Sequence, residues 1–219
     1  MSTAADVATL RVTEIFHSLQ GESTRSGLPT VFVRLTGCPL RCVWCDTAYA
    51  FSGGEAVTLN EVLARVARFG CPTVCVTGGE PLAQKACIDL LVALCDAGYS
   101  VSLETSGALD IGGVDARVSR IVDIKAPDSG EAAKNRWENL ALLTPHDEIK
   151  LVLASAGDYH WARNVLDERR LDTLCPVLFS PVAGRLDPAQ LAAWILRDRL
   201  PVRFQIQLHK VLWGSERAR

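Results

Sequence analysis

The chain has 219 residues, 48% of them hydrophobic, a size at which one sizeable core forms readily and two would be strained. We therefore expect a single domain over residues 1–219. The net charge is −2, and basic and acidic residues are interspersed, so no basic stripe indicates nucleic-acid binding. Residues 1–16 contain no apolar run of signal-peptide length, and no later stretch could span a bilayer. These features predict a cytoplasmic protein without membrane association.

Short β-rich runs recur along the chain, and amphipathic segments separate most of them. The expected strands are 31–35, 73–77, 101–104, 121–124, 148–153, 177–180 and 202–208, with 10–17 as an additional edge or cap. The clearest helix begins after the N-cap Thr58, where Glu61 completes a capping box, and ends at Gly70. Further helices are expected over 85–96, 159–169 and 188–197, and a less regular pattern covers 135–143.

The alternation of strands and helices predicts parallel strands joined by right-handed crossovers. Six or seven βα units are fewer than the eight of a closed (β/α)₈ barrel, so we expect an α/β fold that forms a partial, open TIM-like barrel of mainly parallel strands. A doubly wound sheet is the alternative. In both folds, functional residues gather at the carboxyl ends of the strands. The chemically distinctive segments follow this rule and should line one mouth: 38–45, 77–80, 104–107, 123–125, 180–181 and 209.

Three of the eight cysteines, Cys38, Cys42 and Cys45, form a C-x₃-C-x₂-C loop in which three thiolates can converge on one inorganic centre. A structural zinc site normally has four protein ligands, whereas an iron–sulfur cluster held by three thiolates keeps one iron open to a further ligand. The alternative is a zinc loop completed by a distant histidine or by Cys71 or Cys75. Small buried hydrophobes are expected at the remaining cysteines: 71, 75, 87, 95 and 175.

The triplet, with Trp44 just before its last cysteine, resembles the radical S-adenosylmethionine (SAM) superfamily. The segment 77–81, Thr-Gly-Gly-Glu-Pro, resembles the glycine-rich strand end at which that superfamily contacts SAM. The resemblance implies that the triplet holds a [4Fe–4S] cluster that cleaves SAM to a 5′-deoxyadenosyl radical. The SAM contacts it implies are Trp44, Gly78, Gly79, Glu80, Ser106, Asp123 and Lys125.

Further segments resemble the 7-carboxy-7-deazaguanine synthases, a family of queuosine and 7-deazapurine biosynthesis. They are 14–22, 32–34, Cys-Asp-Thr at 45–47, 104–107 and 207–210, so the likeness covers nearly the whole chain. The resemblance implies radical ring contraction of 6-carboxy-5,6,7,8-tetrahydropterin to 7-carboxy-7-deazaguanine, with loss of ammonia and regeneration of SAM. It also implies Mg²⁺, an electron donor such as flavodoxin, and a homodimer. At 123–125 the chain reads Asp-Ile-Lys where several relatives read Ser-Pro-Lys.

The same resemblance gives roles to individual residues. Thr47 would bind Mg²⁺ through its hydroxyl oxygen, the backbone of Leu19, Gln20 and Gly21 would contact the pterin edge, and Thr77 would add a hydrogen bond to the substrate.

Two residues are candidates on other grounds as well. Arg34 lies opposite the apolar 31, 33 and 35 by strand alternation, and its charged fork suits the substrate carboxylate. His209 could contact the substrate, mediate the final proton loss, or be a structural histidine. Two other functions stay open at this point: a glycyl-radical activase, which would need an exposed groove for a protein substrate, and a zinc-stabilised binding module without catalysis.

Overall fold

The computed structural model of the chain describes residues 8–219, so residues 1–7 of the expected single domain and of the N-terminal segment 1–16 lie outside the described part. Nine strands form one sheet in the order β3-β1-β2-β4-β5-β6-β7-β8-β9. The strands are β1 (Thr9–Leu19), β2 (Pro29–Leu35), β3 (Glu55–Thr58), β4 (Thr73–Gly78), β5 (Ser100–Thr105), β6 (Ser119–Asp123), β7 (Glu148–Leu153), β8 (Val177–Pro181) and β9 (Arg203–Phe204).

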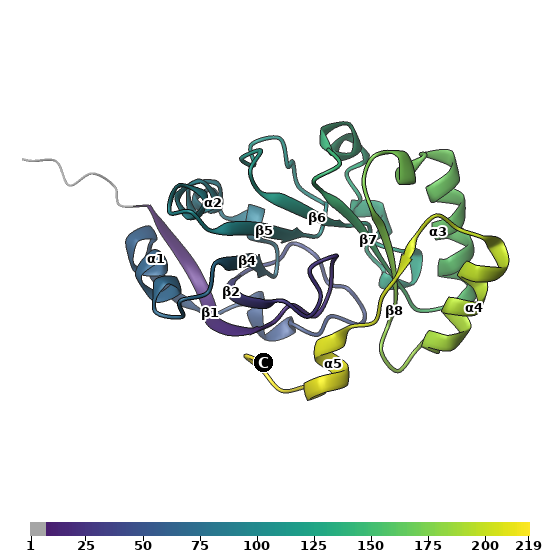
Figure 1. The fold of residues 1–219 in the computed structure, drawn as a ribbon, viewed down its shortest axis with the longest axis horizontal. Coiled ribbons are helices and arrows are strands. Elements are labelled where there is room, and N and C mark those ends of the chain that lie inside the picture. Colours follow the sequence, from purple (N-terminus) through teal and green to yellow (C-terminus); the bar gives the residue numbers. More distant parts are fainter. Residues whose placement is uncertain (1–7) are drawn as a thin grey trace, which may run out of the picture.

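The pairing of the strands confirms the α/β fold and the partial, open barrel. β2 and β4 to β9 pair in parallel along the sheet, whereas β1 pairs antiparallel with both β2 and β3 at one edge. The two ends of the strand order, β3 and β9, do not pair with each other, so the barrel stays open. Figure 1 shows the strands curving around a common interior.

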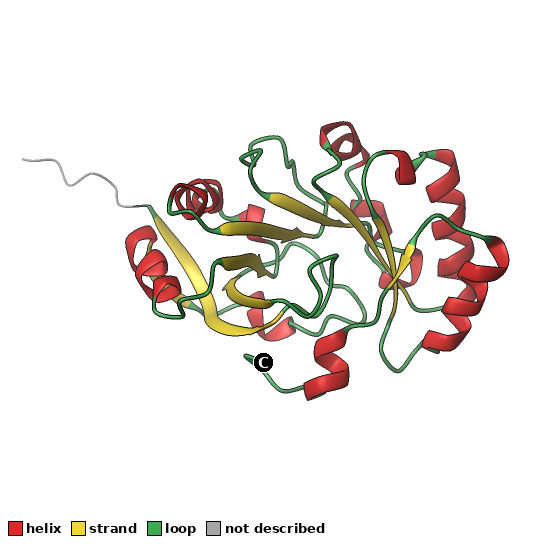
Figure 2. Ribbon diagram, viewed as in Figure 1, coloured by secondary structure: helices red, strands yellow, loops and turns green. Residues whose placement is uncertain are grey.

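Four helices cover the outer face of the sheet (Figure 2). They are α1 (Leu59–Ala67) and α2 (Ala86–Asp96) beside the first strands, and α3 (Ala156–Glu168) and α4 (Pro188–Asp198) beside β7 and β8, while α5 (Leu208–Trp213) lies apart from them. The predicted capping box at α1 is present, because Thr58 Oγ1 accepts from Glu61 N and the Glu61 carboxylate accepts from Thr58 N. No helix within residues 8–219 is both long enough and apolar enough to cross a membrane.

Two expected elements differ from the structure. The segment 135–143 is not an α-helix but contains a 3₁₀ helix, Trp137–Leu142, because the buried Asn139 amide donates to the carbonyls of Gly107 and Leu109 and holds the segment against a loop. The strand expected over 202–208 is only the two-residue β9. After it the chain leaves the sheet and turns into α5.

The two faces of the sheet have different chemistry. On the outer face, alternate aliphatic residues of the strands pack against the helices in two hydrophobic clusters. In β7, for example, Ile149 and Leu151 belong to the outer core, and the alternation turns Glu148 and Lys150 toward the interior. The interior therefore carries the polar and charged side chains that can form a site.

Candidate active site

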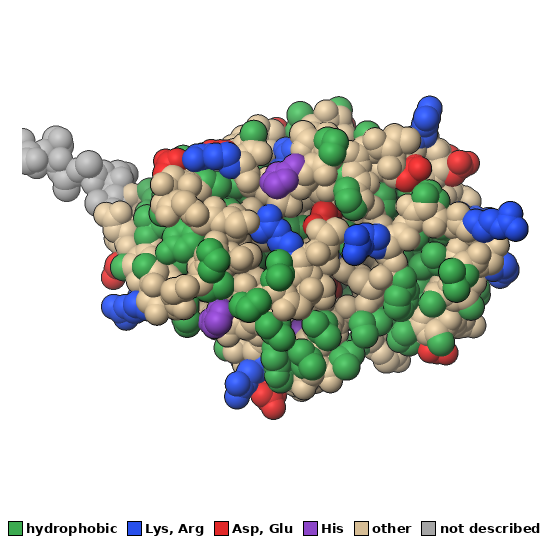
Figure 3. Space-filling model, viewed as in Figure 1, with side chains coloured by type: hydrophobic (Ala, Val, Ile, Leu, Met, Phe, Trp, Pro, Cys, Tyr) green, Lys and Arg blue, Asp and Glu red, His purple; other side chains and the backbone are tan. Residues whose placement is uncertain are grey.

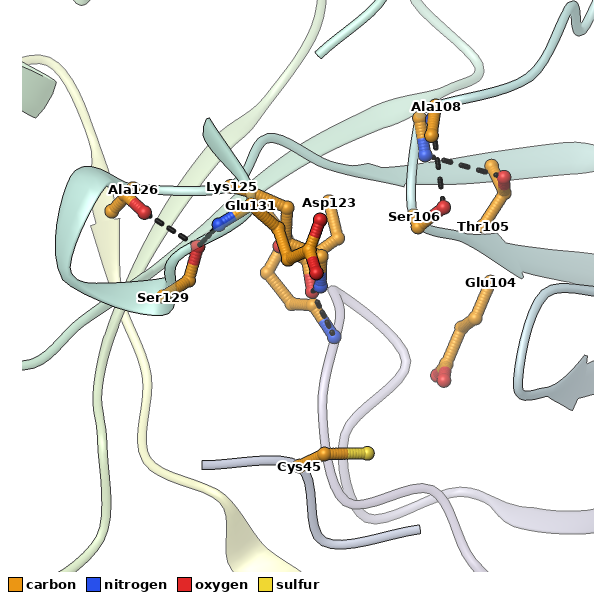
Figure 4. A network of polar contacts seen from close by, with 12 residues as sticks. Cys45, Glu104, Thr105, Ser106, Ala108, Asp123, Lys125, Ala126, Ser129 and Glu131 are labelled. Carbon is orange, nitrogen blue, oxygen red and sulfur yellow. Dashed lines mark hydrogen bonds and ion pairs between the residues drawn. The ribbon is translucent and has the colours of Figure 1, made fainter. Parts of the chain in front are cut away.

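A cavity of about 980 Å³ opens at the carboxyl ends of the parallel strands. Side chains from several segments surround it: Cys45 from the loop after β2, Glu104 from the end of β5, and Asp123 from the end of β6 (Figure 4). Every sequence-predicted site residue except Glu80 lines it, namely Leu19, Gln20, Gly21, Arg34, Cys38, Cys42, Trp44, Cys45, Thr47, Thr77, Gly78, Gly79, Ser106, Asp123, Lys125 and His209.

The three cysteines of the loop are partly exposed and face this cavity. Burial raises the pKa of the Cys38 and Cys42 thiols, and the nearby Lys125 ammonium opposes that effect at Cys42. Three thiols in one loop beside an open cavity are the donor set that a [4Fe–4S] cluster with one open iron requires.

The remaining cysteines do not complete a zinc site with this loop. Cys71 Sγ donates to the Pro29 carbonyl at 3.3 Å, and Cys75 is fully buried in β4. Within residues 8–219, no three His, Cys, Asp or Glu side chains enclose a position suited to a single metal ion. Cys95 departs from the expected burial. It is only partly buried, since eight residues at 3.6 per turn rotate it about 80° from Cys87.

The glycines after β4 hold that strand end against the start of the cysteine loop. A Cβ atom on Gly79 would lie 2.2 Å from the Gly37 carbonyl oxygen, so a side chain there cannot be accommodated without moving the backbone. Gly79 N donates to the Leu35 carbonyl at 3.2 Å, and Glu80 N donates to the Gly37 carbonyl at 2.8 Å. The glycines thus fix the position of the loop that carries the cysteines.

Glu80 is the one predicted SAM contact that does not reach the cavity. Its side chain is fully buried and accepts hydrogen bonds from Leu82 N at 3.0 Å, Ser106 N at 2.7 Å and Thr105 Oγ1 at 3.0 Å, and also from Ser106 Oγ. With both carboxylate oxygens occupied, a direct contact between Glu80 and SAM does not fit this geometry. Glu80 instead fixes the end of β5, from which Ser106 lines the cavity.

Asp123 and Lys125 form an ion pair after β6, with Lys125 Nζ 2.9 Å from Asp123 Oδ2 (Figure 4). The other oxygen, Asp123 Oδ1, is buried and has no hydrogen-bond partner among residues 8–219. Buried acceptors are normally satisfied, so this atom is available to a donor on a bound ligand.

Arg34 faces the cavity from β2, as its strand alternation predicts. Its Nε donates to Glu14 Oε1 at 2.6 Å, and the Tyr49 hydroxyl donates to the same oxygen at 2.8 Å. Burial alone would lower the pKa of Arg34, but Tyr49 and Glu14 outweigh it and raise that pKa. The two terminal guanidinium nitrogens have no hydrogen-bond partner in the described chain and remain available to a ligand anion.

The predicted substrate edge, Leu19 to Gly21, is joined to the C-terminal segment. Leu208 N donates to the Gly21 carbonyl at 2.9 Å, and a Cβ on Gly21 would lie 2.2 Å from His209 Nδ1. The glycine therefore lets the His209 ring approach this edge. Glu104 supports the same region, because it accepts from Gln20 Nε2 at 3.3 Å and from Thr77 Oγ1 at 3.1 Å.

The Cys-Asp-Thr segment connects the cysteine loop to α5. Thr47 Oγ1 lies 3.7 Å from Cys45 Sγ, and Asp46 Oδ2 lies 3.2 Å from Lys210 Nζ and 3.7 Å from His209 Nε2. Burial would raise the pKa of Asp46, but His209 and Lys210 outweigh it and hold that pKa well below its usual range.

Several residues of the site were missed by the sequence reasoning. The clearest signal was in β7, where Glu148 and Lys150 alternate with aliphatic residues, so the pattern alone turns two charges toward the interior. Tyr49 and Arg185 had no signal, whereas the others lie within the segments 14–22, 45–47, 104–107 and 207–210 noted above but were given no role of their own. The missed residues are Glu14, Glu22, Asp46, Tyr49, Glu104, Lys150, Arg185 and Gln207.

Comparison with known proteins identifies the group to which this site belongs. Residues 32–167 match the model of the radical SAM superfamily. A 7-carboxy-7-deazaguanine synthase of Chlorobaculum tepidum is 49% identical, with 99% of this chain and 98% of the relative covered, and one of Koribacter versatilis is 42% identical, with 94% and 98% covered.

The crystal structure of QueE from Escherichia coli has the same fold. It superposes with a TM-score of 0.76 at 23% identity, covering 92% of this chain and 95% of that one. Because the sequence relationship to these synthases extends over nearly the whole chain at 49% and 42% identity, the chain belongs to the 7-carboxy-7-deazaguanine synthase family of the radical SAM superfamily.

Proposed function

We propose that this protein converts 6-carboxy-5,6,7,8-tetrahydropterin to 7-carboxy-7-deazaguanine by radical ring contraction with loss of ammonia. The observation that carries the proposal is that one cavity joins the cysteine loop to the free guanidinium donors of Arg34 and to the backbone edge at Gly21. Relatives with this name match the chain over nearly its full length. The glycyl-radical activase and the zinc-stabilised module lack a corresponding observation.

Membership of the superfamily implies a [4Fe–4S] cluster and SAM. When bound, they supply the 5′-deoxyadenosyl radical that removes a hydrogen atom from the substrate. The side chains of Cys38, Cys42 and Cys45 would hold the cluster. Asp123 Oδ1 would accept a hydrogen bond from a hydroxyl or ammonium group of SAM, while Lys125 Nζ pairs with the other oxygen, Asp123 Oδ2.

Further contacts with SAM would come from the walls of the cavity. Trp44 supplies a flat ring beside the cysteine loop, and Gly78 and Gly79 expose backbone at the end of β4. Ser106, held by Glu80, lines the cavity at the end of the neighbouring strand β5. In this arrangement backbone groups and neutral side chains orient SAM, and Asp123 is the one carboxylate that contacts it.

The substrate would lie between β2 and the loop after β1. Arg34 offers a charged pair of donors to the substrate carboxylate, and Glu14 and Tyr49 hold its Nε side in place. The backbone of Leu19, Gln20 and Gly21 and the Thr77 hydroxyl would contact the pterin. Phe16 and Phe32, whose rings stack at 5.0 Å, give this part of the cavity an apolar wall.

Four finer features belong to the proposal, namely the Mg²⁺ ligand, the electron donor, the homodimer and the role of His209. The Thr47 hydroxyl oxygen would be a protein ligand of Mg²⁺, a hard cation that keeps several non-protein ligands. An electron donor such as a flavodoxin would approach the cysteine loop, whose Val43 is 59% exposed between two cysteines.

A homodimer is supported by hydrophobic side chains that gather over α5 (Figure 3), where Val211 and Leu212 are 65% and 48% exposed. His209 would contact the substrate or accept the proton lost last, since it lies against the Gly21 edge with its Nε2 toward Asp46. Light scattering measures the mass in solution, and a dimer predicts twice the 23.7 kDa mass of the chain.

An anaerobic assay tests the proposed function. The protein is reconstituted with iron and sulfide and incubated with SAM, a reductant, Mg²⁺ and the carboxylated tetrahydropterin, and the product is identified by mass. We expect 7-carboxy-7-deazaguanine and ammonia. A cluster-loaded protein that cleaves SAM but leaves the pterin unchanged would contradict the proposal.

A further inference from the structure

Lys150 is a buried cation that lines the cavity. It lies in β7 and its side chain is 9% exposed, although lysine side chains are rarely buried unless they are paired. Burial alone would lower the pKa of Lys150, but the surrounding carboxylates, Glu22 and Asp123 foremost, outweigh it and raise that pKa above its usual value. The side chain is therefore a permanent charge at neutral pH.

The Lys150 ammonium lies between carboxylates from two different parts of the chain. It donates to Glu22 Oε2, and it lies 3.7 Å from Asp123 Oδ2. Glu22 accepts a second hydrogen bond, from Gln207 Nε2 at 2.9 Å, and Asp123 accepts from Lys125 Nζ at 2.9 Å. The result is one continuous chain of contacts, Gln207–Glu22–Lys150–Asp123–Lys125.

The two ends of this chain of contacts belong to the two parts of the cavity that we propose for different ligands. Glu22 follows the predicted substrate edge, and its backbone N–H donates to Gln20 Oε1 at 3.2 Å. Gln207 precedes Leu208, which donates to the Gly21 carbonyl. At the other end, Asp123 keeps Oδ1 free of any partner in the described residues, on the side that we propose for SAM.

We propose that Lys150 is a positioning residue that couples the binding of SAM to the binding of the pterin, by holding Glu22 and Asp123 in place at the same time. The inference rests on the proposed function, because it needs two ligands in one cavity. It adds to that function a residue which neither the motifs nor the proposed contacts include.

The physical reason is that the two carboxylates share one cation. Without Lys150, Glu22 would keep only Gln207 as a side-chain partner among residues 8–219, and Asp123 only Lys125. Two partly uncompensated buried carboxylates would then have to move, hydrate or bind protons. A ligand that orders Asp123 also orders Lys150 and hence Glu22. It therefore lowers the free-energy cost of ordering Glu22 when the second ligand binds. Coupling of this kind is reciprocal.

The test measures binding, without turnover. The dissociation constant of SAM is determined for the cluster-loaded protein by equilibrium dialysis without reductant, first alone and then with saturating carboxylated tetrahydropterin. For the unaltered protein we expect the pterin to tighten SAM binding at least about fivefold, the lower end of typical couplings. The SAM–pterin ratio is the dissociation constant of SAM alone divided by that with saturating pterin. In Lys150→Met it should fall to within about twofold of one. In Lys150→Arg, which keeps the charge, most of the tightening should return.

Arg120→Met is the matched control. Arg120 is a buried cation on the neighbouring strand β6, paired with Asp147 outside the cavity, so its loss should leave the SAM–pterin ratio unchanged. If Lys150→Met does not load cluster, Glu22→Gln is used for the same binding measurement. It removes the negative charge that pairs with Lys150 on the substrate side.

Two outcomes would overturn the inference alone: an unaltered protein that binds and converts the pterin but shows a ratio of one, or a Lys150→Met protein that keeps the unaltered ratio. A protein that binds no pterin at all would overturn the proposed function together with it.

Discussion

Strands β6 and β7 bury a charged network at each of their two ends, and the two networks differ in what they leave unused. At the amino end, Arg120 donates to both oxygens of Asp147, at 2.9 and 2.6 Å, and to the Leu142 carbonyl at 2.8 Å. Asp147 also accepts from Thr144 N at 2.8 Å. At the carboxyl end, Lys150 lies between Glu22 and Asp123, and Asp123 Oδ1 lacks a partner within residues 8–219.

The difference separates a structural network from a binding one. The amino-end network is closed, lies outside the cavity and joins β6, β7 and the loop before β7. The carboxyl-end network lines the cavity and keeps an unused acceptor, which is what a ligand needs. Substitutions at the amino end should therefore change stability and leave ligand binding intact, whereas substitutions at the carboxyl end should change ligand binding first.

The largest contrast is expected between cysteines at the two ends. Cys42→Ala should abolish bound cluster and SAM cleavage, because it removes one of the three thiolates of the cavity loop. Cys175→Ala is the control: Cys175 is buried just before β8, at the amino end of the sheet, and burial raises the pKa of its thiol to about 12. Iron and sulfide content measures both variants. A cluster that survives Cys42→Ala would remove the triplet from the site.

Arg120→Met should be the most costly change at the closed network. Removing one partner of a buried ion pair leaves Asp147 uncompensated, so we expect a loss of about 3–5 kcal/mol in the free energy of unfolding. SAM affinity of the folded protein should stay as it was. Urea unfolding and SAM binding measure the two effects, and a large change in SAM affinity at unchanged stability would reverse the assignment of the two networks.

The same pair should govern part of the acid sensitivity. Burial would raise the pKa of Asp147, but the hydrogen bonds from Arg120 and from the Thr144 backbone lower it in the folded protein. A carboxyl whose pKa is lower folded than unfolded contributes stability above the unfolded value of about 3.9, and this contribution is lost as the pH falls through the folded pKa. Arg120→Met should lose this contribution, which unfolding curves at about pH 7 and below about pH 3 would measure.

At the cavity, Arg34→Met should cost about 2–5 kcal/mol of substrate binding or transition-state stabilisation. The variant keeps the length of the side chain but removes the charged donors. In the described part of the chain it also leaves Glu14 with only Tyr49 as a side-chain partner. Cluster content should not change. Activity with the carboxylated pterin should fall toward that with an analogue lacking the carboxylate. Undiminished preference for the carboxylate would place its recognition elsewhere.

The smallest effect is expected at Thr47. Thr47→Ala removes one hydroxyl oxygen beside Cys45 and should keep cluster content, while most of the stimulation by Mg²⁺ is lost. Activity as a function of Mg²⁺ concentration measures this. The unaltered protein treated with a chelator is the comparison, and a variant with the full Mg²⁺ response would show that the cation binds to other residues.

The fold and the mouth of the site were predictable from local patterns. Val31, Val33 and Leu35 alternate with Arg34, and the buried strand β2 follows that alternation. The capping box at Thr58 also fixed the start of α1. These features depend on neighbours in the sequence, so periodicity and capping rules detect them.

The partners within the site were not predictable in the same way. Glu14 and Arg34 come from different strands, and Glu22 and Lys150 are 128 positions apart. Such pairs depend on how strands and loops meet in space, which no local pattern records. At Glu80 the motif is recognisable and indicated a contact with SAM, but the carboxylate instead accepts hydrogen bonds from Thr105 and Ser106.

The ratio of product formed to SAM consumed tests the central claim most directly. In the anaerobic assay with reconstituted protein, reductant and the carboxylated tetrahydropterin, both quantities are followed by mass spectrometry over many turnovers. A synthase that regenerates SAM in each cycle should form many molecules of 7-carboxy-7-deazaguanine for each SAM lost. Consumption of one SAM for each product, or SAM loss without the deazaguanine, would contradict the account.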